Sequence, residues 1–291
     1  MLRKLIFQLL LISLIANPVF ADEKKVEAPG VFDMFTNLPR DWATWGKRSF
    51  RGQNLPIIGA TLGVSVAMYA YDVPLWKGTS YHYQKNPGFY RSFSDTGNFI
   101  GDGAFQFGLS GAFGIYGFAA SDNRALRTAS QVIEVILATG LVIQTLKHLT
   151  GRESPSALDG TCSKGCWHGP VSMKKYFGHV SKYDAVPSGH IATSLATAQV
   201  IIENYPDAKW IPYVAYPVVG TVGLGIVANS SHWWSDIPFG LLIGYSFSQV
   251  VAHPDKKTEE KTSYVTPILE PNVAMITTAE GRPTMGLRWD F

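Results

Sequence analysis

Charged residues and cysteines are both scarce in this chain of 291 residues. Asp, Glu, Lys and Arg together make up 16% of it, whereas about 25% is usual in soluble proteins. The formal net charge is only +3 and no basic stripe is present, which argues against nucleic acid as a partner. With 46% hydrophobic residues, the composition favours a cell-envelope or membrane setting, although the mean hydropathy of +0.05 is low for a protein with many membrane spans.

The first 21 residues have the parts of a secretory signal peptide. Arg3 and Lys4 precede an apolar run at residues 5–15, and Val-Phe-Ala at residues 19–21 resembles a cleavage site. An uncleaved anchor helix is the alternative. The sequence therefore predicts an exported protein, located in the periplasm or in a cell-envelope membrane with its site facing the periplasm.

The two cysteines, Cys162 and Cys166, lie close together in the sequence. In an exported chain such a pair predicts a local disulfide. Two thiols supply too few soft ligands for a structural metal, even with His168 nearby, so we expect no metal site here. A disulfide would also place this loop on the oxidising side of the inner membrane.

Apolar runs separated by turn residues predict a mainly α protein, a bundle of five to six core helices. The expected helical segments are residues 55–71, 104–120, 130–149, 191–203, 210–228 and 236–252. Residues 72–103, rich in aromatic and turn residues, are expected to form a loop. Aromatic residues at helical spacing within residues 32–50 predict an amphipathic segment, which either lies on a lipid surface or packs against the bundle.

These patterns divide the chain into five parts. Residues 1–21 form the signal peptide, 22–54 a leader with the amphipathic segment, 55–252 the helical domain, 253–262 a charged linker, and 263–291 a short β extension. The β extension is expected to form a small C-terminal sheet or hairpin, with strands at 264–269, 273–278 and 284–291.

The apolar segments are short for membrane spans. Each uncharged run has about 13–19 residues, and a span needs about 20. If six segments crossed after signal cleavage, the cysteine loop would lie in the cytoplasm, which conflicts with a disulfide. Either fewer segments cross, or the bundle is a periplasmic globule with a wholly buried core; the second reading is slightly favoured.

Two histidine motifs delimit the segment on which the functional prediction depends. Ser188 and Gly189 predict a helix start with bare amide groups, which places His190 where an anion would bind. His232 and Asp236 stand four residues apart, a spacing that puts both on one face of a helix. A carboxylate beside an imidazole fixes its tautomer and raises its basicity, as a nucleophile or general base requires.

Together with Lys147, these motifs resemble the type 2 phosphatidic acid phosphatase and haloperoxidase (PAP2) superfamily over residues 55–252. The family pattern has three parts. The first is a lysine followed seven residues later by Arg-Pro, and the second is Pro-Ser-Gly-His. The third is Ser-Arg, then five residues, a histidine, three further residues and an aspartate. The resemblance implies the helical bundle of that family. It also implies a phosphatase acting on a phosphomonoester or pyrophosphate.

In such an enzyme His232 would attack phosphorus and form a phosphohistidine, with Asp236 orienting its ring. His190 would protonate the leaving group and then activate water. Lys147, the Ser188 hydroxyl and the Gly189 amide would hold the phosphate oxygens. The resemblance implies neither a metal nor another cofactor. Aromatic residues near the expected mouth favour a lipid phosphate over a small soluble phosphoester, and hence contact with a membrane surface.

Two positions depart from the family pattern. Ser154 and Ile226 stand where the family has arginines, and bidentate arginine contacts are among the strongest bonds to phosphate. Arg152, two residues before Ser154, is the expected substitute. The departures keep open a weakened family member that acts as a binding or structural envelope protein. They count against a vanadate-dependent haloperoxidase, which needs the full arginine set.

Overall fold

The computed structural model describes residues 26–85 and 88–254 in full, together with the backbone of residues 272–277 and 283–288. The predicted signal peptide at 1–21, most of the linker and the predicted strand at 264–269 lie outside the described residues.

The described chain is mainly helical, as predicted. Its α-helices are α2 (Asp33–Thr36), α3 (Leu38–Ser49), α4 (Leu55–Ala70), α5 (Asp72–Lys85), α6 (Phe89–Gly101), α7 (Gly103–Ala120), α8 (Asn123–Thr150), α9 (Met173–Gly178), α10 (Gly189–Asn204), α11 (Ile211–Ala228) and α12 (Ile237–Ala252). Four 3₁₀ turns join them: η1 (Gly52–Asn54), η2 (Pro155–Ala157), η3 (Val180–Lys182) and η4 (Trp234–Asp236). The six apolar runs coincide with α4, α7, α8, α10, α11 and α12.

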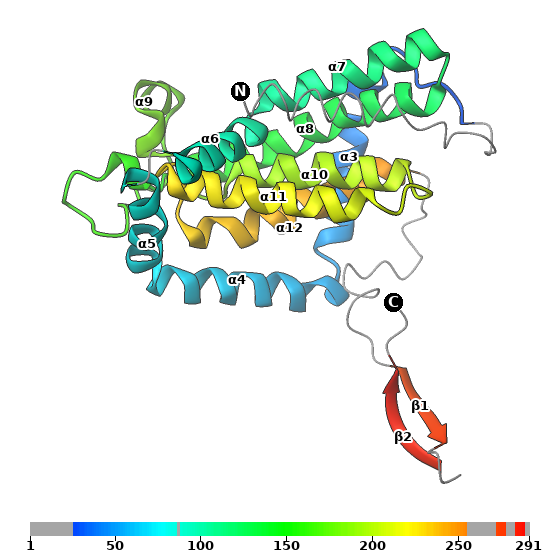
Figure 1. Ribbon diagram of the computed structural model, residues 1–291. Helices are drawn as coiled ribbons and strands as arrows, with labels where there is room; N and C mark the ends of the chain where they lie inside the picture. Colours follow the sequence, from blue (N-terminus) through cyan, green and yellow to red (C-terminus); the bar gives the residue numbers. More distant parts are fainter. Residues whose placement is uncertain (1–25, 86–87, 255–271, 278–282, 289–291) are drawn as a thin grey trace.

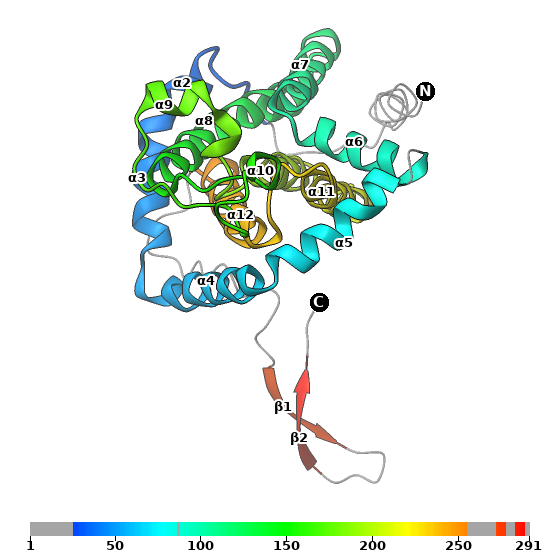
Figure 2. The ribbon, with the colours of Figure 1, turned by 90° about the vertical axis from the view of Figure 1, so that its left-hand side faces the viewer.

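The core lies among α8, α10 and α12, which run side by side along the bundle (Figures 1 and 2). Small residues on α10, including Ala192 and Ala196, pack against β-branched residues of α8 and against Ile243 and Phe247 of α12. The segment at residues 32–50 forms α2 and α3. Within α3, Trp42 donates a hydrogen bond to the Ala138 carbonyl of α8, so this helix packs against the bundle.

The prediction of a loop at residues 72–103 was wrong, because this segment forms α5 and α6. Pro74 lies in the first turn of α5, where a missing N–H breaks no helical hydrogen bond. The glycines of α6 serve close packing rather than turns. A Cβ at Gly97 would lie 2.2 Å from the Thr221 carbonyl oxygen, and one at Gly225 would lie 2.5 Å from the Ser94 carbonyl oxygen. These glycines therefore allow α6 and α11 to pack backbone to backbone.

A wholly buried core was the favoured reading of the apolar segments, and the structure contradicts it. None of the residues of α4 is buried. Large apolar side chains also stand out from α7 and α11, with Phe118 84% and Tyr213 81% exposed. By length and composition α8 and α11 could each cross a membrane, and the pair formed by residues 52–70 and α5, bent by 71°, could make a third, broken span. This apolar surface suits a lipid environment.

Near the C-terminus, the described backbone contains two strands, β1 (Asn272–Thr277) and β2 (Pro283–Arg288). They pair antiparallel, with Asn272 opposite Arg288 and Thr277 opposite Pro283.

Candidate active site

The predicted site residues lie at the end of α8, at the start of α10 and in the connection that leads into α12. Figure 2 views the bundle from this end. Lys147 lies in the last turn of α8, Ser188 to His190 form the start of α10, and His232 precedes η4 in the connection to α12. The Ser188 amide donates to the Asp236 carbonyl oxygen at 3.2 Å. This bond joins the two histidine-bearing segments directly.

His232 is held in the tautomer of a nucleophile. Its ring is buried, and Nδ1 lies 2.6 Å from the carbonyl oxygen of Ala185. A carbonyl oxygen only accepts, so Nδ1 carries the proton and Nε2 keeps its lone pair. The ring centroid of His190 lies 5.8 Å away, with the two rings edge to face.

Asp236 supports His232 less directly than the sequence predicts. The two residues do not share an α-helix, since η4 separates them and α12 begins at Ile237. Asp236 Oδ2 lies 3.6 Å from His232 Nδ1 and accepts a hydrogen bond from the Trp233 amide at 2.8 Å. The Asp236 carboxylate therefore fixes the turn that carries His232 and supplies a nearby negative charge, while Ala185 orients the ring.

Arg152, the predicted substitute for the family arginines, is bound by other groups of the protein. Its guanidinium is buried, and its terminal nitrogens donate to Asp236 Oδ1 at 2.5 Å, Ser235 Oγ at 2.7 Å, Asp72 Oδ2 at 2.7 Å and the Lys164 carbonyl oxygen at 3.1 Å. Both terminal nitrogens are thus fully used by the protein itself. Arg152 is a positioning residue, because it joins the start of α5 to the Asp236 carboxylate.

The disulfide loop helps to hold Arg152 in place. Cys162 and Cys166 are bonded to each other in the structure. The Cys166 carbonyl accepts from the Glu153 amide at 2.9 Å, and the Cys166 amide donates to the Glu153 carboxylate at 3.0 Å. Lys164, inside the same small ring, supplies the carbonyl that Arg152 binds. The loop therefore closes over the segment that carries Arg152 and Glu153.

Lys147 is paired with Asp184, a residue that the sequence analysis missed. The ammonium lies 2.8 Å from Asp184 Oδ2, and the Tyr176 hydroxyl donates to the other carboxylate oxygen. Burial by itself raises the pKa of Asp184, but Lys147 and Tyr176 outweigh it and lower the pKa below its ordinary value. Asp184 is thus a carboxylate paired with the lysine that is predicted to bind phosphate.

Ser188 and Gly189 lie at the start of α10 and provide polar groups to the site. The Ser188 hydroxyl is buried, and no described residue bonds to it. A Cβ at Gly189 would lie 3.7 Å from Lys147 Nζ, which places the first turn of α10 beside the ammonium. The first amides of a helix have no partner within it and favour anions. An unsatisfied buried hydroxyl beside such a helix start indicates a ligand.

The pKa of His190 is shifted downward, so its ring is neutral near pH 7. Burial, followed by the neighbouring His232 and Lys147, lowers the pKa of His190 to about 4. A bound phosphate would reverse this electrostatic balance, because an opposite charge close by stabilises the imidazolium.

Residues 128–258 match the sequence model described as the PAP2 superfamily. The matched residues include every predicted site residue from Lys147 to Asp236. No curated protein sequence matches the chain. One similar solved structure is the transmembrane PAP2 type phosphatidylglycerolphosphate phosphatase from Bacillus subtilis, at 14% identity and a TM-score of 0.39. The match covers 79% of this chain and 100% of that one. The sequence identity and the TM-score are too low to assign the substrate of that enzyme to this chain.

Within the matched region, neither of the two positions that depart from the family pattern offers a cation to phosphate. Ser154 is buried, with its amide bonded to the Ser181 carbonyl. Ile226 is fully buried in an apolar cluster with Val222 and Ile191, and its carbonyl accepts from the His232 amide at 3.1 Å. The Ile226 carbonyl therefore helps to place His232, although the Ile226 side chain cannot bind an anion.

The charges of the side chains around this site sum to a negative value. Lys147 and Arg152 face three carboxylates, those of Asp72, Asp184 and Asp236. A phosphate dianion entering the site must therefore compete with Asp184 for Lys147.

Proposed function

We propose that this protein is a phosphatase that hydrolyses a phosphomonoester or pyrophosphate through a phosphohistidine on His232. The observation that carries the proposal is the hydrogen bond from His232 Nδ1 to the Ala185 carbonyl, which leaves the Nε2 lone pair free to attack. The unsatisfied Ser188 hydroxyl and the start of α10 support it, because they offer donors for phosphate oxygens.

The reaction has two displacements at phosphorus. First, His232 Nε2 forms a bond to phosphorus while the bond to the leaving oxygen breaks, and protonated His190 gives that oxygen a proton. Next, neutral His190 takes a proton from water, whose oxygen attacks phosphorus and breaks the P–N bond. Inorganic phosphate and regenerated His232 result. Lys147, Ser188 and Gly189 hold the non-bridging oxygens once Asp184 has given up the ammonium.

A lipid phosphate is the proposed substrate class, with the site on the periplasmic side of the cell envelope. The exposed apolar faces of α4, α7 and α11, and the span-length helices α8 and α11, support contact with lipid. The predicted signal peptide supports export.

The test is phosphate release by the full chain in EDTA from a panel of phosphatidic acid, phosphatidylglycerophosphate, undecaprenyl pyrophosphate and a soluble phosphoester. His232→Ala is expected to abolish release, whereas His179→Ala, an exposed histidine outside the site, is the matched control and keeps it. Phosphate release that persists in His232→Ala would contradict the proposal.

A second candidate is a binding protein that has lost catalysis. The Lys147–Asp184 pair and the buried Arg152 favour it, because no cation is free for phosphate among these residues. Absence of turnover on the whole panel, with none gained in the double variant Ser154→Arg/Ile226→Arg, would support this alternative. Turnover by the natural chain excludes it.

A further inference from the structure

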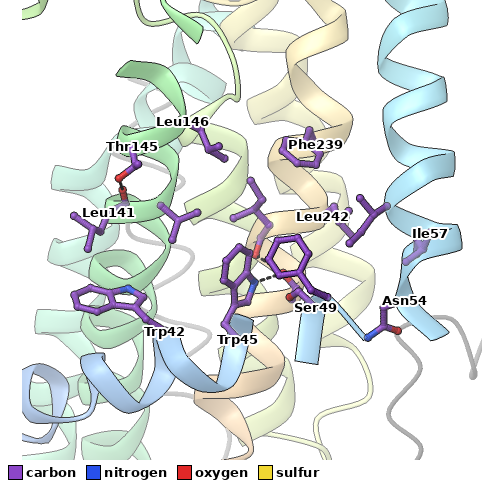
Figure 3. A pocket seen from close by; sticks show the side chains of 15 residues that line it. Trp42, Trp45, Ser49, Asn54, Ile57, Leu141, Thr145, Leu146, Phe239 and Leu242 are labelled. Carbon is purple, nitrogen blue, oxygen red and sulfur yellow. Dashed lines mark hydrogen bonds between the residues drawn. The ribbon is translucent and has the colours of Figure 1, made fainter. Parts of the chain in front are cut away.

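Helix α5 runs across the end of the bundle at which the candidate site lies, whereas α4 runs along the bundle (Figure 1). Residues 52–70 and α5 are bent by 71° relative to each other. None of the residues of α4 is buried, and α4 borders an apolar groove with α3, α8 and α12 (Figure 3). In a lipid environment α4 would therefore lie in the hydrocarbon, and the bend would place α5 near the plane of the head groups.

The inner face of α5 is fixed to the segment that carries His232. Trp76 Nε1 of α5 donates to Ser230 Oγ at 3.0 Å. Thr79 Oγ1 of α5 accepts from Trp234 Nε1, also at 3.0 Å. Because Ser230 and Trp234 each stand two residues from His232, the position of α5 determines the position of the proposed nucleophile.

The opposite, outer face of α5 carries basic and aromatic side chains. Lys77, Tyr81 and Lys85 follow one another at intervals of four residues, a spacing that puts them on one side of a helix. All three are exposed, Tyr81 by 57%. Beside them His82 stacks on Tyr90 of α6, with the ring centroids 5.4 Å apart. The outer face thus presents an aromatic ring between two ammonium groups.

This outer face is cationic. Lys77 and Lys85 have no carboxylate partner among the described residues. Arg91 of α6 is exposed as well and lies over the Tyr83 ring at 5.4 Å. Within the described residues 73–85 and 88–101 the one acidic residue is Asp95, which is half-buried and accepts from the Tyr83 hydroxyl at 2.9 Å. An anionic surface would therefore meet three cations and no fully exposed carboxylate on these two helices.

The neighbouring helix indicates which anionic surface fits. Helix α5 continues directly from α4, whose exposed side chains include Leu62, Val64 and Val66. Such an apolar helix suits hydrocarbon, and tyrosine and lysine are the residues that lie where hydrocarbon meets the head groups. A soluble anionic partner would leave the apolar side chains of α4 in water. The sequence of an apolar helix, a bend and an aromatic, basic helix therefore selects a lipid leaflet.

We propose that the outer face of α5 binds the head groups of anionic phospholipids. Lys77 and Lys85 bind head-group phosphates, and the Tyr81 ring lies between them at the boundary with the acyl chains. Because the inner face of α5 holds the residues on both sides of His232, this contact sets the depth of the candidate site relative to the head groups. Binding of anionic lipid by α5 does not depend on catalysis at that site.

The experiment is photo-crosslinking of the full chain in vesicles of phosphatidylglycerol and phosphatidylcholine, with one of the two lipids tritiated in each sample. The photoreactive residue p-benzoylphenylalanine replaces Tyr81. We expect labelling by phosphatidylglycerol, relative to its share of the lipid, to exceed labelling by phosphatidylcholine about threefold. Lys77→Gln/Lys85→Gln is expected to abolish this preference without lowering the melting temperature, because both side chains are exposed.

Two controls accompany this measurement. Lys174→Gln/Lys175→Gln removes two exposed cations from α9 instead and is expected to leave the preference at position 81 unchanged. The same photoreactive residue at Phe118 of α7, which is 84% exposed, is expected to label both lipids in proportion to their shares. Equal labelling of both lipids from position 81, a preference that persists in Lys77→Gln/Lys85→Gln, or labelling of a second copy of the chain in place of lipid would each overturn the proposal.

Discussion

Replacing Asp184 with asparagine should make the site bind phosphate more tightly. The substitution keeps the shape of the side chain but removes the negative charge that lies 2.8 Å from Lys147 Nζ. Two unit charges about 4 Å apart interact by about 4 kcal/mol at an effective dielectric constant of 20. Because the Asp184 side chain is 22% exposed, solvent screens part of this interaction energy. A third of the interaction energy, about 1.4 kcal/mol, already changes the Kd for phosphate tenfold.

The assay is isothermal titration of inorganic phosphate, and separately of vanadate, into the full chain. Asp184→Asn is expected to lower both dissociation constants at least tenfold. Asp159→Asn is the control, because Asp159 carries the same charge on the same loop but pairs with Lys182. Unchanged or weaker binding in Asp184→Asn would refute the reasoning, and would show that Asp184 orients Lys147 for phosphate instead of competing with it.

Two further predictions concern stability. Arg152→Lys should lower the free energy of unfolding by about 3 kcal/mol in urea titrations, because one ammonium cannot bridge Asp72 and Asp236 and leaves a buried carboxylate unpaired; an unchanged midpoint would contradict this. The pKa of His190 in the folded protein is about 4, which lies below its value in the unfolded chain. As the pH falls from 6.5 toward 4, the unfolded chain therefore takes up a proton at His190 before the folded protein does, and the free energy of unfolding decreases. The expected loss is about 3 kcal/mol, and His190→Gln should flatten that pH dependence.

The sequence predicted the helices with long apolar runs well, because burial of a continuous helical face depends mainly on local pattern. The sequence analysis missed α5 and α6. In these helices Pro74 lies at a helix start and Gly97 allows close helix packing, whereas both residue types were interpreted as loop signals. Pro74 and Gly97 can be interpreted correctly only when the facing helix is known.

The same division holds for the site. The spacing of the motifs predicted that Lys147, His190 and His232 would gather at helix ends, and the structure places them there. The partners of buried charges were not predictable, because ion pairs form between segments that are distant in the sequence. Arg152 therefore joins Asp72, eighty residues away, while Asp184 lies on the lysine expected to hold phosphate.

The central claim is that His232 carries the phosphoryl group. The direct measurement is rapid acid-free quenching of the full chain during turnover of a ³²P-labelled lipid phosphate, followed by digestion and mass spectrometry of the peptide that contains His232. The account predicts an alkali-stable, acid-labile phosphate on His232 that disappears in His232→Ala. Steady turnover with no label on His232 would contradict it.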